Sequence, residues 1–451
     1  MLFLQIFVII CFSVVIISLF NEATDFLTFS IGAMTVAAVG TVLLMPDEVN
    51  VEDFILSIEW EVIFFLIALF TIIQVLDEKG VFEEVALRIT EKFQTNSREF
   101  FWVMCLVSTL SAALIEDISV TVIFVPMTIR TCQKMHVNPA PFLLAMAVSI
   151  NLASTLTPFG SSENILIAND FNLSGSWFLT SLGLYFIITT ILTLVLLDQF
   201  ILKRSLHEIW LPHCDLYEEP CDYDHLSPHE LVIMEEHVNP RVFWRNIGAL
   251  IIFTVLLFLI PSILLVGIIG VLMFVCINPR MNKKGKKRPD ISYYFSKVDF
   301  RLVFFFVTLF VLVYCMELNG TLLIIENWVL MVAPNDIFIV CLFILLFTSL
   351  LSGFLDNVPV TIMFIPIIGV LISEVNAATP ILIAFILGVN LGGNFLPQGT
   401  ASDMITLEFA KKEFVHDMNY KRLLKVGGLF AVFHILMGAL YLALYIYVFH
   451  A

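Results

Sequence analysis

Two short polar motifs interrupt long apolar stretches of the sequence and carry carboxylates where a lipid environment would penalise them. The first reads Ile-Glu-Asp-Ile-Ser-Val-Thr over residues 115–121, and the second reads Leu-Asp-Asn-Val-Pro-Val-Thr over residues 355–361. A carboxylate at membrane depth is costly and normally faces a cavity or a partner. The two motifs therefore predict functional positions inside a membrane.

Two proline-containing segments add further polar side chains in apolar surroundings. Gly160 follows Pro158 by two residues, and Gly399 follows Pro397 in the same way. A glycine at such a place would let the backbone bend and expose carbonyl oxygens. The candidate substrate- and ion-binding residues from the motifs, these segments and two nearby asparagines are Glu116, Asp117, Ser119, Thr121, Asn151, Gly160, Ser161, Glu163, Asn164, Asp356, Asn357, Thr361, Asn390, Gly399, Thr400 and Asp403.

The side chains at these places favour a cation. They include five carboxylates and no Lys or Arg. Hard oxygen ligands suit Na⁺, and a buried carboxylate also takes up H⁺, so the two ions would compete. Half-helix ends could instead offer N–H groups to an anion. A further alternative, strongest for Glu163 and Asp403, is that the carboxylates only cap half-helices.

Composition places these motifs in a membrane protein. The 451 residues are 59% hydrophobic and only 14% charged, too apolar to cover a soluble protein of this size. Many apolar runs reach the roughly 18–20 residues that span a bilayer. We therefore expect an all-α polytopic membrane protein whose partner is the lipid bilayer, with no nucleic acid. Residues 1–20 lack a basic segment and a cleavage site, so they are interpreted as the first span.

An internal repeat covers nearly the whole chain. Residue 117 of the first motif matches residue 357 of the second, a spacing of 240. Other matching positions are Gly80 and Gly320, Pro126 and Pro366, and, with one residue deleted, Asn151 and Asn390. Chance similarity between apolar stretches would not keep these residue types in register. The predicted divisions are a first repeat over 1–202, an acidic linker over 203–245 and a second repeat over 246–451.

Each repeat is expected to hold one re-entrant hairpin and one interrupted helix. The hairpins are predicted over 100–133 and 336–373, and the interrupted helices over 140–168 and 379–410. Non-helical backbone at membrane depth survives only where it lines a protein or water-filled cavity. Each repeat would then cross the membrane five times, an odd number that inverts the second copy. Twelve ordinary spans are the alternative.

Loop charges predict the orientation. Residues 280–297 carry a cluster of Lys and Arg, whereas the matching segment 47–59 carries only acids. By the positive-inside rule, 280–297 and the linker 203–245 are cytoplasmic and both termini are external, in the plasma membrane. The linker also holds five histidines, with Cys214 and Cys221. A metal site or pH sensor is one interpretation, and an acidic linker without a ligand is the other.

Residues 58–65, 156–160 with Asn164, and 354–359 resemble the ion-transporter superfamily. That group includes arsenite-efflux permeases, D-type sodium/proton antiporters, and citrate or dicarboxylate carriers. The resemblance implies a scaffold domain and a transport domain that moves as an elevator, and its elevator members are often homodimers. By motif position, it also implies Na⁺ sites that pair Asp117 with Gly160 and Asn357 with Gly399.

Two departures from the superfamily pattern bear on the substrate. Glu116-Asp117 stands where the arsenite and antiporter branch usually has Asp-Asn, and the neutral Ser-Asn-Thr tips of the dicarboxylate branch are absent. The second departure counts against a citrate-like substrate.

The favoured function is a secondary cation (Na⁺)/proton antiporter, not an enzyme, with Na⁺ and H⁺ as coupling ions and no cofactor. The alternative is an H⁺- or Na⁺-coupled carrier or efflux permease for an anion or oxyanion such as arsenite or citrate. A third hypothesis is a non-transporting membrane receptor. No Gly-x4-Gly-Lys-Ser/Thr loop is present, so ATP-driven pumping would require an ATPase partner.

Overall fold

The computed structural model describes residues 2–19, 25–45, 49–93, 95–115, 117–205, 237–260, 262–281, 287–324, 327, 336–375 and 377–449. These residues are almost wholly helical, apart from an antiparallel pairing of β1 (Arg280–Met281) with β2 (Lys287–Arg288). Within the described ranges, 7 helices are long and apolar enough to cross a membrane, and shorter apolar helices accompany them. The prediction of an all-helical polytopic membrane protein is confirmed.

The two halves repeat one order of helices. The first half comprises α1 (Leu2–Leu19), α2 (Phe26–Leu44), α3 (Val51–Leu56), α4 (Trp60–Glu78), α5 (Val81–Phe93), α6 (Ser97–Ala112), α7 (Asp117–Lys134), α8 (Ala140–Ala153), α9 (Ser162–Asp170) and α10 (Gly175–Leu197), followed by the π-helical η1 (Asp198–Leu202) and α11 (Lys203–Ser205). The second half comprises α13 (Pro240–Leu259), α14 (Ile263–Ile277), α15 (Ile291–Phe295), α16 (Phe300–Leu318), α18 (Ile337–Phe354), α19 (Asn357–Val375), α20 (Ala378–Gly392), η4 (Pro397–Gly399), α21 (Ala401–Lys412), α22 (Tyr420–Leu444) and η5 (Tyr445–Phe449). α4 and α16 begin at residues 60 and 300, which is the spacing of 240 seen in the sequence.

The turns that follow α4 and α16 share a backbone requirement. Gly80 has a φ of 61° and Gly320 a φ of 74°. L side chains avoid this left-handed region, which glycine enters without steric cost. The match between the two glycines in the sequence therefore reflects the same turn in both halves.

The polar motifs and the proline segments fall at helix ends, as predicted. α6 and α7 pack against each other across the first motif, and α18 and α19 do so across the second. α8 and α9 are separated by residues 154–161, and α20 and α21 by residues 393–400, where η4 is the only helical turn. At all four places, backbone N–H and C=O groups at the helix ends therefore have no hydrogen-bond partner within their own helix.

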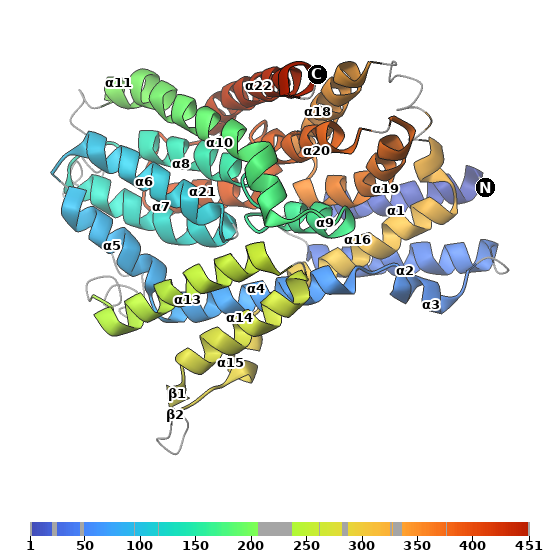
Figure 1. Ribbon diagram of the computed structural model, residues 1–451, viewed down its shortest axis with the longest axis horizontal. Helices are drawn as coiled ribbons and strands as arrows, with labels where there is room; N and C mark the ends of the chain where they lie inside the picture. The colour runs from blue at the N-terminus through green and yellow to red at the C-terminus, as the bar shows by residue number, and fades with distance from the viewer. Residues whose placement is uncertain are drawn as a thin grey trace.

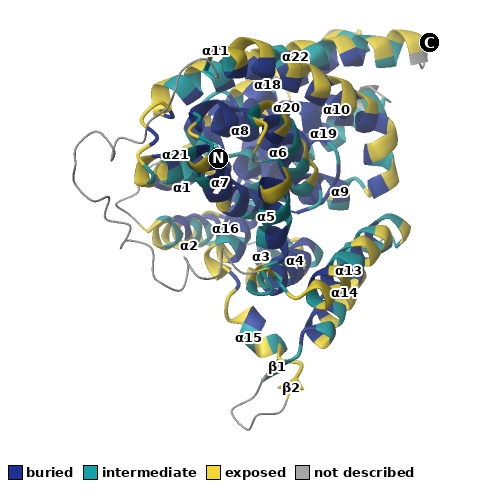
Figure 2. Cartoon of the chain, turned by 90° about the vertical axis from the view of Figure 1, so that its left-hand side faces the viewer, coloured by how far each residue is buried: buried dark blue, intermediate teal, exposed yellow. Residues whose placement is uncertain are grey.

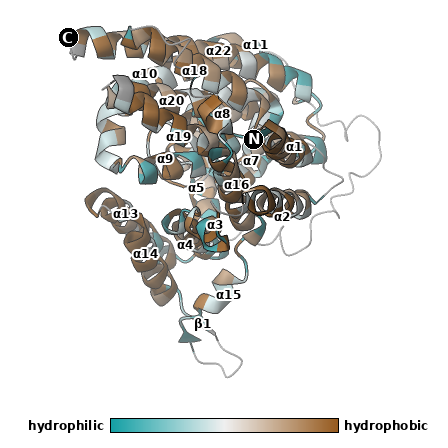
Figure 3. Ribbon diagram, turned by 90° about the vertical axis from the view of Figure 1, so that its right-hand side faces the viewer, coloured by the Kyte–Doolittle hydropathy of each residue, from teal (hydrophilic) through white to brown (hydrophobic). Residues whose placement is uncertain are grey.

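The helices form two packed groups (Figure 1). In the first group, α4 packs on α14, which packs on α13, and α2 packs on α1 and α16. In the second group, α8 and α20 are surrounded by α6, α10, α18 and α22. Every residue of α8 is buried, and Figure 2 shows α8 and α20 in the dark interior. Figure 3 shows hydrophobic colour over most of the helices, as expected of surfaces that face lipid.

The last residues of the predicted linker, 203–245, belong to α13. α13 begins at Pro240 because Asn239 caps it, accepting a hydrogen bond from the Arg241 N–H at 3.0 Å, and proline suits the first helical position. Residues 206–236, with four of the linker histidines and both of its cysteines, lie outside the described residues. The metal or sensor hypothesis for them stays a prediction.

The last linker histidine is described, and it bridges two carboxylates of α5. His237 Nδ1 lies 3.2 Å from Glu84 Oε2, and its Nε2 lies 3.0 Å from Glu91 Oε1. The Glu84 side chain is 1% exposed and also accepts hydrogen bonds from Arg88 Nε at 2.7 Å and the Val238 N–H at 2.9 Å. The hydrogen bond to Glu84, together with the charges of Glu84 and Glu91, raises the pKa of His237 above its ordinary value.

This contact predicts a pH-dependent stability. Because the folded pKa of His237 is raised, its contribution is fully present below the unfolded pKa of about 6.5 and is lost as pH rises through the folded pKa. We expect the melting temperature of the wild type to exceed that of His237→Asn at about pH 6, and the difference to shrink as the pH rises through the folded pKa. A thermal unfolding series in detergent measures the difference. A difference that does not change with pH would contradict a charged bridge.

Candidate ion and solute site

The two motifs meet the two helix breaks inside the second helix group. The first break is the segment 154–161 between α8 and α9, and the second break is the segment 393–400 between α20 and α21. α7 packs against α21, and α19 packs against α9, so the motif helix of each half faces the broken helix of the other half. Electrostatic interactions link Asp117 with Glu163, Asp356 and Asp403. Four of the five predicted carboxylates are thus gathered at one place. The fifth, Glu116, lies outside the described residues.

The helix ends at this place supply partial charges of both signs. Asp117 and Asn357 begin α7 and α19, while the side chains of Ser161 and Thr400 cap α9 and α21 by accepting N–H groups of their first turns. N-terminal helix ends carry partial positive charge, and the C-terminal ends of α6, α8, α18 and α20 carry exposed carbonyls. The site can therefore interact with a cation and with an anion.

Each helix break packs closely against backbone through a glycine. A Cβ atom on Gly160 would lie 2.9 Å from the carbonyl oxygen of Ala112, at the end of α6. A Cβ atom on Gly399 would lie 2.7 Å from the carbonyl oxygen of Gly393, and one on Gly393 would lie 3.4 Å from Asn357 Oδ1. Neither Gly160 nor Gly399 has a positive φ. The close approach to backbone is therefore the requirement for glycine that the structure shows at these two positions, and the predicted role in bending the chain stays a prediction.

Glu163 and Asn357 connect the first break with the second motif. The buried Glu163 accepts a hydrogen bond on Oε1 from Asn357 Nδ2 at 3.0 Å. The Ser352 hydroxyl lies within hydrogen-bond distance of both Asn357 Oδ1 and the Val389 carbonyl oxygen, the latter at 2.6 Å, and can donate its single hydrogen to either. Ser352 was not predicted from the sequence. It is an ordinary serine in an apolar helix, and the sequence offers no signal for its role.

Asp403 combines deep burial with a polar atom that lacks a hydrogen-bond partner. Its side chain lies in a residue that is 2% accessible to solvent, and its Oδ1 atom has no hydrogen-bond partner among the described residues. The hydroxyl of Thr121, on the facing helix α7, is also buried without a partner there. Buried polar oxygens without partners are costly. A cation, a proton or a water molecule bound at these atoms would remove that cost.

Other predicted residues make local bonds. Asp117 Oδ1 accepts the Ile118 N–H at 2.9 Å, and Asp356 Oδ1 accepts the Val358 N–H at 3.1 Å, as the capping alternative expects. The Thr361 hydroxyl donates to the carbonyl of Asn357 within its own helix at 2.9 Å. Ser119 lies half-buried on α7. Asp117 also has a side-chain contact with Ser402 on α21.

The motifs and the breaks contribute no positive side chain to the site, because the sequence places no Lys or Arg there. The described residues also contain no group of three or more His, Cys, Asp or Glu side chains arranged to hold a metal ion. A Na⁺ ion here would need backbone carbonyls and amide or hydroxyl oxygens in addition to a carboxylate. The Na⁺ pairs expected from the resemblance stay predictions.

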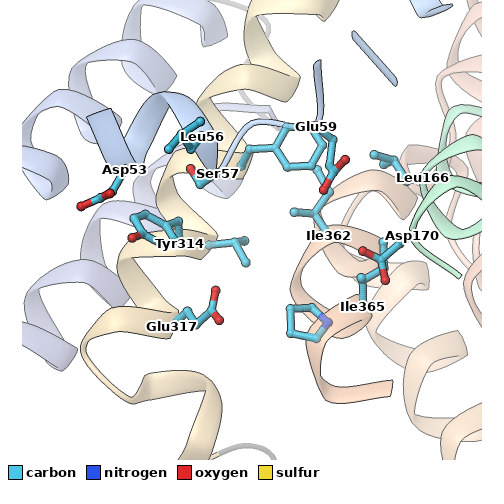
Figure 4. Close-up of a pocket in the computed structure, with 13 residues that line it drawn as sticks. Asp53, Leu56, Ser57, Glu59, Leu166, Asp170, Tyr314, Glu317, Ile362 and Ile365 are labelled. Carbon is cyan, nitrogen blue, oxygen red and sulfur yellow. The ribbon is translucent and has the colours of Figure 1, made fainter. Parts of the chain in front are cut away.

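A pocket of about 380 Å³ lies between the two helix groups, beside α9 and α19. Figure 4 shows side chains of α3 and α16 on one side of it, and side chains of α9 and α19 on the other. Four carboxylates line it: Asp53, Glu59, Asp170 and Glu317. Glu59 Oε2 also accepts a hydrogen bond from Asn169 Nδ2 at 3.2 Å, which joins the two groups. None of the residues predicted for the site lines this pocket.

The paired helix groups, the broken helices and the buried carboxylates define a helical membrane transporter. The sequence model of the CitMHS family, described as "Citrate transporter", matches residues 15–388 and 291–450. The chain belongs to this family, and therefore to the ion-transporter superfamily that its motifs resemble. It is a transporter and not an enzyme, and it works in a lipid bilayer on a small solute.

Curated relatives cover nearly the whole chain. The "46 kDa membrane protein" of Mycobacterium leprae is 26% identical over 417 residues, covering 89% of this chain and 91% of the relative. An "Uncharacterized transporter" of Methanocaldococcus jannaschii is 24% identical over 409 residues, covering 90% of this chain and 95% of the relative. The similarity therefore extends over both halves of the chain.

Two solved structures share the fold. The YdaH transporter of Alcanivorax borkumensis aligns with a TM-score of 0.60 at 11% identity, covering 85% of this chain and 84% of YdaH. MtrF of Neisseria gonorrhoeae, described with a class of antimetabolite efflux pumps, aligns with a TM-score of 0.57 at 11% identity, covering 90% and 84%. At this identity the likeness concerns the fold alone.

Proposed function

We propose that this chain carries a small carboxylate of the citrate type across the membrane, coupled to Na⁺ or H⁺. Membership of a family described as "Citrate transporter" supports the substrate class. The observation that carries the proposal is the meeting of helix N-termini with four carboxylates, of which Glu163 and Asp403 are buried and Asp117 and Asp356 half-buried. Helix N-termini attract anions, but the carboxylates repel them until a cation or proton neutralises the charge. Cation binding would thus be a condition for anion binding, which couples the two fluxes.

This substrate replaces the antiporter as the leading function. The absence of neutral Ser-Asn-Thr tips in the sequence argues against a citrate-like substrate, whereas the family match supports a carrier of anions. Na⁺/H⁺ antiport is retained as the second candidate because the site holds four described carboxylates and its motifs and breaks contain no Lys or Arg. In that reaction the two cations would compete for the same carboxylates. The cation sites are shared by both candidates, and only the anion distinguishes them.

The transport movement is proposed from the arrangement of the helices. We assign the first helix group to a scaffold and the second, with re-entrant hairpins α6–α7 and α18–α19, to a transport domain that moves as an elevator. The division of the chain into inverted repeats 1–202 and 246–451, joined by a linker 203–245 whose last residues form the start of α13, is part of this proposal. A homodimer is expected by the same resemblance. The Glu59–Asn169 contact and the pocket lie between the two groups, where such a movement would change them.

Ion pairs support the proposed orientation. Glu78, at the end of α4, pairs with Arg280 Nε at 3.2 Å and with Lys297 Nζ at 3.4 Å. This end of α4 therefore lies on the same face as the basic segment 280–297, which we place in the cytoplasm. The opposite end of α4, with Glu59 and the acidic pocket, would face the outside. Both termini are then external, in the plasma membrane.

Uptake by proteoliposomes tests the proposal. We expect labelled citrate to enter when an inward Na⁺ or H⁺ gradient is imposed, and Asp356→Asn to lower the initial rate at least about tenfold, equivalent to about 1.4 kcal/mol. Glu408→Gln is a matched control, because Glu408 is an exposed carboxylate on α21. Collapse of a pH gradient by Na⁺ without citrate would establish antiport instead. Folded protein that performs neither reaction would reject both candidates.

A further inference from the structure

We propose that Asn151 and Asn390 are positioning residues, each of which orients the helix break of the opposite half. The sequence predicts both as substrate- or ion-binding residues, and in the structure their side chains reach into the opposite half. The inference rests on the proposed function, because it treats the two breaks as the places where coupling ions bind.

Asn151 on α8 bonds to the second break through both atoms of its amide. Its Nδ2 donates to Asn394 Oδ1 at 2.8 Å and lies 3.4 Å from Thr400 Oγ1. Its Oδ1 accepts a hydrogen bond from Ser402 Oγ at 3.0 Å. Thr400 caps α21, and Ser402 lies in the first turn of that helix, directly before Asp403. A helix of the first half therefore holds the end of α21 that carries a buried carboxylate.

Asn390 on α20 makes the reciprocal contacts with the first break. Its Nδ2 donates to Asn164 Oδ1 at 2.8 Å, and its Oδ1 accepts a hydrogen bond from Ser161 Oγ at 3.3 Å. Ser161 caps α9, the helix that carries Glu163. The two asparagines occupy matching positions in the repeat, and both are almost fully buried. Each half therefore contributes one buried asparagine that bonds to the break of the other half.

The hydrogen-bond inventory of the two amides favours positioning over ligation. An asparagine side chain has two N–H donors and one carbonyl acceptor. Asn151 directs its donors at Asn394 and Thr400, and Asn390 directs its donors at Asn164 and at the Ile386 carbonyl, 2.8 Å away. Each amide oxygen already accepts a hydroxyl. Turning either amide toward an ion would break bonds that hold the opposite break.

The crossed contacts link the two ion-binding breaks. A cation that binds the carboxylate of Asp403 or Glu163 would shift the end of the helix that carries this residue. That helix end is hydrogen-bonded to an asparagine of the other half. Buried networks of this kind transmit such changes because each member has few alternative partners. We therefore expect ion binding at the two breaks to be coupled, and loss of one asparagine to affect mainly the break opposite to it.

Hydrogen exchange of the purified full-length protein tests this crossed assignment. In Asn151→Ala, amide exchange over residues 401–406 should rise at least about tenfold while residues 162–167 stay unchanged, and Asn390→Ala should give the reverse. Ser402→Ala removes one bond of the same network from the other side, so it should reproduce the Asn151 pattern if Asn151→Ala does not fold. Asn246→Ala is the matched control, because Asn246 is a fully buried asparagine that bonds to Asn278 in the first helix group.

A cation titration separates positioning from simple structural support. The Na⁺ or H⁺ concentration that half-maximally protects residues 401–406 should rise at least about threefold in Asn151→Ala or Ser402→Ala. Loosening of 162–167 instead, an unchanged cation dependence, or no cation response in the wild type would each overturn the inference. Absence of citrate uptake alone would remove the proposed substrate and leave the exchange pattern to decide the positioning.

Discussion

Replacement of Gly160 or Gly399 by alanine should lower the transport rate at least about tenfold, equivalent to about 1.4 kcal/mol, while the helices stay intact. The added Cβ would lie 2.9 Å from the Ala112 carbonyl oxygen in the first case and 2.7 Å from the Gly393 carbonyl oxygen in the second. Both neighbours are backbone atoms, so they cannot turn aside as a flexible side chain could. Overpacking of this kind typically costs about 1–3 kcal/mol. The break must then move away from the residues against which it packs.

The measurement is the initial rate of gradient-driven citrate uptake, with a melting curve for each variant. Gly183→Ala in α10 is the control, because a Cβ there would meet nothing within 4 Å. It should keep the wild-type rate, and its stability should be equal or slightly higher, since alanine favours a helix over glycine by about 0.5–1 kcal/mol. Wild-type transport in Gly160→Ala would show that close packing of the first break is not needed for movement of the solute.

The arrangement of helices could be predicted from the sequence because it depends on local signals. Apolar runs locate the spans, and the motifs at 115–121 and 355–361 mark the places where helices end. The glycines at 80 and 320 mark the same turn in both halves. Each of these features follows from the residues at that point in the chain. The boundary of α13 was missed by a few residues because Asn239 and Pro240 extend the helix beyond its apolar part.

The partners within the candidate site could not be predicted in the same way. In a duplicated chain, each possible contact partner in one half has a counterpart of similar chemistry at the matching position of the other half. Spacing cannot decide whether Asn151 contacts its own break or the other one. The structure places it against Ser402 and Asn394, in the opposite half. The acids of the pocket were not assigned to a site, because Asp53 and Glu59 were interpreted only as loop charges that set the orientation, and Asp170 and Glu317 lie far from them in the sequence.

Asp403→Asn should produce a protein that is at least as stable as the wild type but has lost the dependence of uptake on a cation gradient. Asp403 is buried beside other carboxylates, and its Oδ1 has no partner among the described residues. Removing a buried charge that has one oxygen without a hydrogen-bond partner relieves a cost, whereas an amide of the same shape cannot be neutralised by Na⁺ or H⁺. The backbone bond of this residue to Thr400 Oγ1 is kept, so the cap of α21 survives the substitution.

This combination of results distinguishes an ion-binding carboxylate from a capping one. A structural cap would lose stability on substitution and leave cation dependence unchanged, which is the opposite pattern. Glu408→Gln on the same helix should change neither property, because the exposed pair of Glu408 with Lys412 contributes at most about 1 kcal/mol. Melting curves and uptake at several imposed Na⁺ and H⁺ gradients measure both quantities on one preparation. Cation-driven uptake that persists in Asp403→Asn would transfer the coupling role to Asp117 and Glu163, which meet Asp403 in the same cluster.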